Sequence, residues 1–163
     1  MSGILTHLYN RKPLRMRRAI LIDIIAALFI VLFTYAAVSK LIDFQKFRVQ
    51  LGQSPLLTAF AGPVAWIVPS VEILIAVLLA TERFKLLGLY ASFSLMTMFS
   101  AYIILITQFS IYIPCSCGGI LEHLTWNQHL LFNICFLFFA LAGLLLHSNN
   151  PIIQSAKTRE IVT

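Results

Sequence analysis

Charged residues are scarce in this chain. Of its 163 residues, 11% are charged and 60% are hydrophobic, whereas a soluble domain has roughly 25% charged and roughly 45 to 50% apolar residues. A soluble domain of this length buries only about 70% of its surface, so it could not hide this many apolar side chains from water. The low charge excludes an ordinary soluble fold and indicates a protein embedded in a lipid bilayer.

Four apolar stretches are long enough to cross about 30 Å of hydrocarbon, which takes about 20 helical residues. We expect helices at about 19–41, 62–80, 86–110 and 127–147. Backbone groups in lipid must pair within their own segment, which favours helices, and the alternating patterns of a membrane β-barrel are absent. The sequence therefore predicts an all-α, four-transmembrane-helix bundle over residues 19–147, preceded by a basic arm, 1–18, and followed by a tail, 148–163.

No Lys or Arg lies between the third and fourth expected helices. Nine of the twelve basic residues lie in the arm, in the connection between the second and third helices, and in the tail, and three lie in the first loop. By the positive-inside rule, both termini are cytoplasmic and the connection between the third and fourth helices faces outward. In a bacterial inner membrane that side is the oxidising periplasm. The net charge of +6 then meets anionic lipid head groups and requires no nucleic-acid partner.

The N-terminal basic and apolar segment resembles a signal peptide in part. Its apolar run is about 20 residues long and no small-residue cleavage site follows. We therefore interpret it as a retained first helix.

Only three cysteines are present, which excludes a fold held together by many disulfides, but two of them are one residue apart in "PCSCGG", residues 114–119. Side chains two apart on an α-helix point about 200° away from each other. Pro114 and the two glycines also disfavour a helix here. A Cys-x-Cys ring would be strained and hence easily reduced, and it is too small to stabilise the fold by closing a loop.

Three interpretations of Cys115 and Cys117 remain open: a redox-active pair, which thiol chemistry and the expected compartment favour, a metal site, and an inert or structural pair. A metal site is disfavoured because two thiolates are half of a usual zinc set, and neither His123 nor His129 completes a recognised spacing. If residues 120–124 form a short helix, its N-terminal end would favour the Cys117 thiolate as the nucleophile. We interpret Cys135 as a small apolar filler of the fourth helix rather than a resolving thiol.

Glu72 is the one charged residue of the second expected helix, about 15 Å below its outer end. An acid at this depth is costly and indicates either a function or a buried partner. It could carry a proton or accept a hydrogen bond from a bound redox molecule, or it could pair with Lys40, and both alternatives remain open. His129 and Asn133, four residues apart, could line the bundle interior or be interfacial polar residues near Trp126.

Local patterns predict further features. Apolar residues at helical spacing continue the first helix beyond residue 39 until a turn at 52–55. Pro69 is expected to kink the second helix. Thr125 and Gln128 match a capping box at the start of the fourth helix. Gly88 and Ser92 are small enough for close helix contact.

Three segments together carry a family resemblance: "AAVSKLIDFQKF" (36–47), "VPSVEILIAVLL" (68–79) and "PCSCGG" (114–119). They resemble the MauE-like membrane proteins of the DoxX-like superfamily, in the order of that family. The resemblance implies a four-helix fold similar to vitamin K epoxide reductase and DsbB-type membrane oxidoreductases, with cysteines at the outer surface and quinone as a candidate electron acceptor. It also places Lys40, Asp43, Glu72, Cys115 and Cys117 on the patterned positions of the family.

MauE-like proteins are associated with methylamine utilisation, where they act with a thioredoxin-like partner in maturing a disulfide-rich periplasmic dehydrogenase subunit. The resemblance therefore implies a membrane thiol-disulfide redox protein. Cys115 and Cys117 would exchange electrons with a periplasmic thioredoxin-like partner during envelope protein maturation. Glu72, Lys40 and His129 would form a polar pocket able to hold quinone, and no metal site is expected. The alternative is a non-catalytic membrane subunit or assembly factor of an envelope complex, in which the loop serves as a docking surface.

Overall fold

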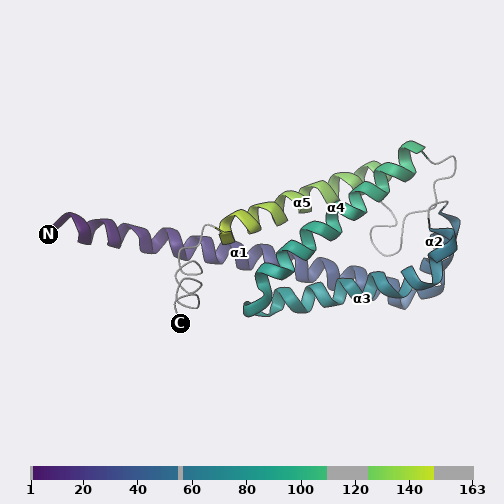
Figure 1. Ribbon diagram of the computed structural model, residues 1–163, viewed down its shortest axis with the longest axis horizontal. Helices are drawn as coiled ribbons and strands as arrows, with labels where there is room; N and C mark the ends of the chain where they lie inside the picture. Colours follow the sequence, from purple (N-terminus) through teal and green to yellow (C-terminus); the bar gives the residue numbers. More distant parts are fainter. Residues whose placement is uncertain (1, 55–56, 110–124, 149–163) are drawn as a thin grey trace, which may run out of the picture.

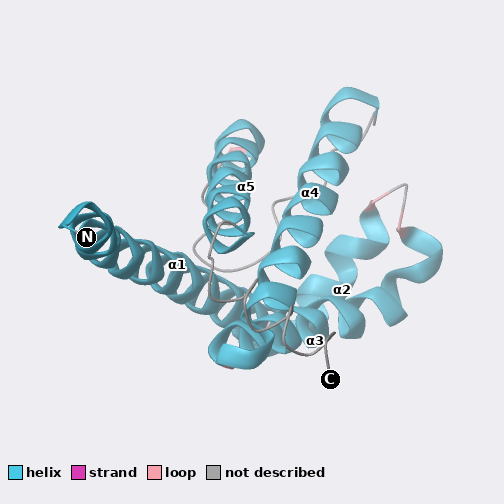
Figure 2. Ribbon diagram, turned by 60° about the vertical axis from the view of Figure 1, so that its left-hand side comes forward, coloured by secondary structure: helices cyan, strands magenta, loops and turns pink. Residues whose placement is uncertain are grey.

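The computed structural model describes residues 2–54, 57–109 and 125–148, and these residues form helices joined by short turns, with no strand among them (Figure 2). The expected all-α fold is confirmed. The elements in chain order are α1 (Ser2–Ile42), α2 (Phe44–Gln53), η1 (Thr58–Phe60), α3 (Ala61–Ala80), η2 (Glu82–Phe84), α4 (Lys85–Phe109) and α5 (Trp126–Ser148).

Within the described ranges, four helical stretches are long and apolar enough to cross a membrane. They are Met16–Ile42, Thr58–Ala80, Glu82–Gln108 and Trp126–His147. Each exposes large apolar side chains, such as Val31, Val77 and Leu131, on its outer surface. Such exposure would be unfavourable in water and is favourable in lipid. The chain is therefore a multi-pass membrane protein.

The helices are arranged as two packed pairs, α1 with α3 and α4 with α5, and further contacts of α3 with α4 and of α1 with α5 join the pairs (Figure 1). The N-terminal part of α1, which includes most of the basic arm, extends beyond the other helices. We call the end of the bundle that carries α2 the α2 end, and the opposite end, where α3 connects to α4, the Lys85 end. The C-terminal end of α4 and the N-terminal end of α5 both lie at the α2 end.

The core is built from large aromatic and aliphatic side chains. Phe29 and Phe33 of α1 are almost fully buried and stack with ring centroids 5.7 Å apart, and Phe29 meets Phe136 of α5 edge to face at 5.3 Å. Leu79 of α3 and Leu89 of α4 are also buried in this cluster. Since lipid is as apolar as these residues, close packing rather than exclusion from water holds the helices together.

Close contact between α3 and α4 depends on Gly88. A Cβ atom at this position would lie 2.9 Å from the Leu79 side chain and 3.0 Å from its backbone nitrogen. Ser92, which is fully buried one turn later, donates a hydrogen bond to the Gly88 carbonyl at 2.7 Å. Gly88 therefore allows the close helix contact that was expected at this position.

The first helix continues past residue 39, as expected, but changes direction at Asp43 before α2. Backbone hydrogen bonds continue across this point, from the Asp43 N–H to Ser39 at 3.2 Å and from the Phe47 N–H to Asp43 at 3.0 Å. Phe47 and Leu51 of α2 are buried with Ala65 of α3 in a second, smaller core. The turn in the chain thus brings α2 against the beginning of α3 and closes the α2 end of the bundle.

The beginning of α5 is fixed by the predicted capping box. The Thr125 N–H donates to Gln128 Oε1 at 2.9 Å, and the Gln128 N–H donates to Thr125 Oγ1 at 3.4 Å. The two residues thereby satisfy donors that a helix start would otherwise leave unpaired. This places His129 and Asn133 in the first two turns of α5.

Candidate functional site

A buried ion pair joins α1 to α3. Lys40 Nζ lies 2.7 Å from Glu72 Oε1, and the Glu72 side chain is 1% exposed. The ammonium group also donates to the Ala36 carbonyl at 3.3 Å and lies 5.9 Å from the centre of the Phe47 ring on α2. Of the two alternatives that the sequence left open for Glu72, pairing with Lys40 is therefore observed.

The local sequence explains how the two charges meet. Lys40 lies in the last turn of α1, where the negative end of the helix dipole favours a cation. Glu72 lies within α3, one turn after Pro69, which is buried inside this helix. Proline has no N–H, so the carbonyl of Ala65 loses its partner within the helix. The unpaired carbonyl of Ala65 and the carboxylate of Glu72 thus lie within two turns of each other on α3.

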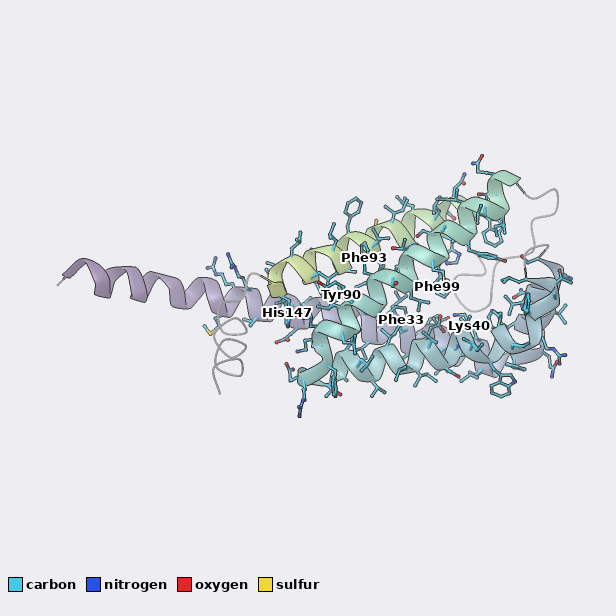
Figure 3. The ribbon with its side chains drawn as sticks, in the orientation of Figure 1. Phe33, Lys40, Tyr90, Phe93, Phe99 and His147 are labelled. Atoms are coloured by element: carbon cyan, nitrogen blue, oxygen red, sulfur yellow. The ribbon has the colours of Figure 1, made fainter. Side chains whose placement is uncertain are left out.

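The pair borders a cavity of about 400 Å³ at the α2 end of the bundle. All five α-helices contribute to its wall. Its lining consists mostly of aliphatic and aromatic side chains, together with a few polar ones: Leu32, Phe33, Ala36, Lys40, Phe47, Leu51, Leu57, Val64, Ile67, Val68, Glu72, Met96, Met98, Phe99, Tyr102, His129, Phe132 and Asn133. In Figure 3, Lys40 and Phe99 lie toward the α2 end, whereas Tyr90 and His147 lie toward the Lys85 end.

Three buried polar atoms at this cavity have no hydrogen-bond partner among the described residues. They are Glu72 Oε2, His129 Nδ1 and Asn133 Nδ2. An unpaired polar group away from water costs free energy comparable to a lost hydrogen bond, and more when it is charged. His129 and Asn133, which are one turn apart on α5, thus line the interior beside the ion pair. The residues that carry these atoms line the cavity, so its wall includes an acceptor and a donor that lack a partner.

Sequence reasoning missed part of this site. No pattern in the sequence singles out Tyr102, yet it lines the cavity and donates a hydrogen bond to Ser54 Oγ at 2.9 Å. The contribution of Phe47 and Leu51 depends on the turn at Asp43, which no local pattern reveals. Asp43 itself is exposed at that turn and does not line the cavity.

The three cysteines fall in different places. Cys115 and Cys117 lie outside the described residues, in the stretch 110–124 that connects α4 to α5. Both flanking helix ends lie at the α2 end, which is also the end that holds the cavity (Figure 1). Cys135 is a free, exposed cysteine on α5 and does not line the cavity. Its exposure does not fit the expected role of a packed filler, because its side chain faces outward.

A second charged cluster lies at the Lys85 end and was not expected from the sequence. Lys85 Nζ lies 2.7 Å from Asp23 Oδ1 of α1 and 2.6 Å from Glu82 Oε1 of η2. The lysine side chain is buried while both acids are largely exposed. This cluster connects α1 to the start of α4, and its three residues are not among those that line the cavity beside Lys40 and Glu72.

The donor set of the described residues also bears on metal binding. Nowhere in residues 2–54, 57–109 and 125–148 do three or more His, Cys, Asp or Glu side chains come close enough together to hold a metal ion. What the described residues do form is a buried ion pair beside an apolar cavity.

A family model described as "Methylamine utilisation protein MauE" matches residues 18–146. The chain belongs to the MauE family. The match extends over nearly all of the four membrane-spanning helices and includes Lys40, Glu72, His129 and both cysteines of the Cys-x-Cys sequence. A search of curated proteins and a search of solved structures each found no match. Within this MauE-family chain, the cavity and its ion pair thus fall in the part that defines the family.

Proposed function

We propose that this MauE-family protein is a membrane thiol-disulfide redox protein whose reacting groups are Cys115 and Cys117. The observation that carries the proposal is a Cys-x-Cys sequence, within the region matched by the family, between two helix ends at the same end of the bundle as the buried ion pair. Two thiols this close in sequence suit exchange better than stapling, because the ring that they form is strained and small.

The charge distribution supports an outward-facing pair. Nine of the twelve Lys and Arg residues lie on the side of the termini, which the positive-inside rule assigns to the cytoplasm. In the inner membrane of a bacterium the cysteines would then face the periplasm, where disulfides persist. A thiol pair on that side has access to periplasmic proteins and is separated from cytoplasmic reductants.

The exchange proceeds through a mixed disulfide with a periplasmic thioredoxin-like partner. A thiolate of the partner attacks the Cys117 sulfur, the bond between Cys117 and Cys115 breaks, and Cys115 leaves as a thiolate. The second thiolate of the partner then attacks the partner's first sulfur, which is bonded to Cys117 in the mixed disulfide. Cys117 leaves as a thiolate. The partner is oxidised to a disulfide as the Cys-x-Cys pair is reduced to a dithiol, and the same steps in reverse pass two electrons to the partner.

The ion pair supports this function by its position rather than by reacting. Lys40 and Glu72 join α1 to α3 at the end of the bundle where the cysteine-containing connection begins and ends. A buried pair of this kind fixes one arrangement of the helices, because any other would leave a charge unpaired. It therefore helps hold α1 against α3 at the end of the bundle where the cysteine-containing connection begins and ends.

Capture of the mixed disulfide tests the proposal. In Cys115→Ser, Cys117 retains its thiol but lacks the thiol that would resolve the intermediate. After acid quenching and alkylation, non-reducing gels should show a covalent complex with an envelope protein that disappears on reduction. Cys135→Ser, which removes the exposed thiol of α5, is the matched control and should show none.

Absence of such a complex in both Cys115→Ser and Cys117→Ser, together with normal disulfide content of envelope proteins in cells that carry Cys117→Ser, would contradict the redox function. That result would favour a non-catalytic subunit or assembly factor of an envelope complex.

A further inference from the structure

We propose that the cavity between the helices is a binding site for a neutral, lipophilic phenol, with Glu72 and Asn133 recognising its hydroxyl group. The residues from which the site is argued are all described ones, and the argument uses neither Cys115 nor Cys117. The inference therefore goes beyond the proposed redox function and does not depend on it.

The size and lining of the cavity indicate a small apolar molecule. Its volume of about 400 Å³ falls in the range of small-molecule pockets, about 300 to 1,000 Å³. Five aromatic side chains line it: Phe33, Phe47, Phe99, Tyr102 and Phe132. Aromatic rings pack favourably edge to face or offset against another ring. The wall is thus suited to an aromatic ring more than to a flexible hydrocarbon chain.

Two of the three unpaired polar atoms at the cavity define what the ring must carry. Glu72 Oε2 is an acceptor, and the Asn133 side-chain nitrogen is a donor; the two residues are 1% and 3% exposed. A hydroxyl group donates one hydrogen bond and accepts others, so it carries the kind of partner that each of these two atoms lacks. A molecule with carbonyl oxygens only, such as a quinone, would leave the Glu72 oxygen unpaired, and a hydrocarbon would leave both unpaired.

The charges on the wall disfavour an ionic ligand. A carboxylate, a phosphate or an amine would find no net counter-charge on the wall, because Lys40 and Glu72 already neutralise each other. The pair is neutral as a whole, and burial makes any additional uncompensated charge costly. Together with the aromatic wall, this leaves a neutral ring with a hydroxyl substituent as the best match.

The test compares two probes that differ only in the hydroxyl hydrogen: 4-hexylphenol and its methyl ether. Binding of each tritiated probe to the full-length protein in lipid nanodiscs is measured, with empty nanodiscs as the baseline. We expect the phenol to bind about tenfold or more tightly than the ether, because a hydrogen bond to a charged group contributes at least that much. This comparison uses the unaltered protein and does not depend on the folding of any variant.

Three variants locate the site. Val68→Phe fills the cavity from α3, and Asn133→Leu removes the donor while keeping the side-chain size; both should weaken binding of the phenol about tenfold or more. Ser92→Ala, the matched control, changes a buried polar residue of α4 that is not part of the cavity, and should bind the phenol normally. Unfolding temperature in the same nanodiscs shows that each variant is folded.

Two results would overturn the proposal. Equal binding of the phenol and the ether would mean that the cavity takes apolar molecules, lipid included, without recognising a hydroxyl group. Undiminished binding of the phenol to folded Val68→Phe would mean that the probe binds elsewhere.

Discussion

Glu72 on α3 accepts a hydrogen bond from Lys40 on α1 across 2.7 Å, inside a bundle whose other membrane-spanning residues are mostly apolar. The carboxylate is almost fully buried, and its second oxygen faces a cavity without a partner among the described residues. This one contact has two roles in the molecule. It is a structural connection between helices, and it is the polar part of a pocket.

The Lys40–Glu72 pair should be a strong determinant of stability. Lys40→Met leaves the buried carboxylate unpaired, which we expect to destabilise the protein by about 3 to 5 kcal/mol. The double variant Lys40→Met with Glu72→Met should recover most of this loss, because neither charge then remains. The free energy of unfolding in detergent is measured for Lys40→Met, Glu72→Met and the double variant, each relative to the unaltered protein, as a double-mutant cycle.

Arg48→Met is the control for that cycle, since it removes an exposed cation of α2 and should change stability little. A double variant as unstable as the sum of both single variants would contradict the direct pairing of the two residues.

The contact of α4 with α3 should be sensitive to a single methyl group at Gly88. Gly88→Ala places a Cβ atom 3.0 Å from the backbone nitrogen of Leu79, which cannot move aside as a side chain can. We expect a loss of about 1 to 3 kcal/mol in the free energy of unfolding. Gly62→Ala is the matched control, because nothing lies within 4 Å of a Cβ at that position of α3. Equal stability of the two variants would show that α3 and α4 are not this close.

The acids at the Lys85 end should matter less than Glu72. The side chains of Asp23 and Glu82 are 60% and 85% exposed, and an exposed ion pair contributes about 0 to 1 kcal/mol. Asp23→Asn and Glu82→Gln should therefore each lower stability by less than about 1 kcal/mol. Glu72→Gln, measured alongside, should cost clearly more. A larger loss of stability in Glu82→Gln than in Glu72→Gln would contradict this prediction.

Cys135 should be dispensable for redox exchange. It is exposed on the outer surface of α5, away from the cavity, so a lipid-soluble maleimide should label it in native membranes. Cys135→Ser should leave the redox state of Cys115 and Cys117 in cells unchanged, as judged by alkylation mass shifts. A shift of that redox state in Cys135→Ser would mean that Cys135 acts as a resolving thiol.

Much of the fold follows from the sequence because lipid imposes simple rules. The low charge predicts the spanning helices, and the capping residues Thr125 and Gln128 predict the start of α5, where their reciprocal hydrogen bonds are observed. Glu72 could be singled out because an acid in the membrane is costly, and Lys40 was named as one possible partner for the same reason.

The family resemblance implied a pocket formed by Lys40, Glu72 and His129, and all three line the cavity. The rest of its wall could not be predicted, because it depends on contacts between distant segments. Phe47 reaches Lys40 only because the chain turns at Asp43. Tyr102 of α4 meets Ser54 at the end of α2, 48 residues earlier in the chain. Lys85 joins Asp23 of α1 across 62 residues. Spacing along one helix carries no information on such pairs, which arise from how the helices pack.

The redox state of Cys115 and Cys117 in living cells tests the central claim most directly. Cells are quenched with acid, free thiols are alkylated with a mass-tagging reagent, and the Cys135→Ser protein is used so that only these two cysteines report. We predict a mixture of the dithiol and the disulfide that moves toward one form when the periplasmic thiol-disulfide balance is changed. A single, unchanging state of both cysteines under every such condition would contradict the account.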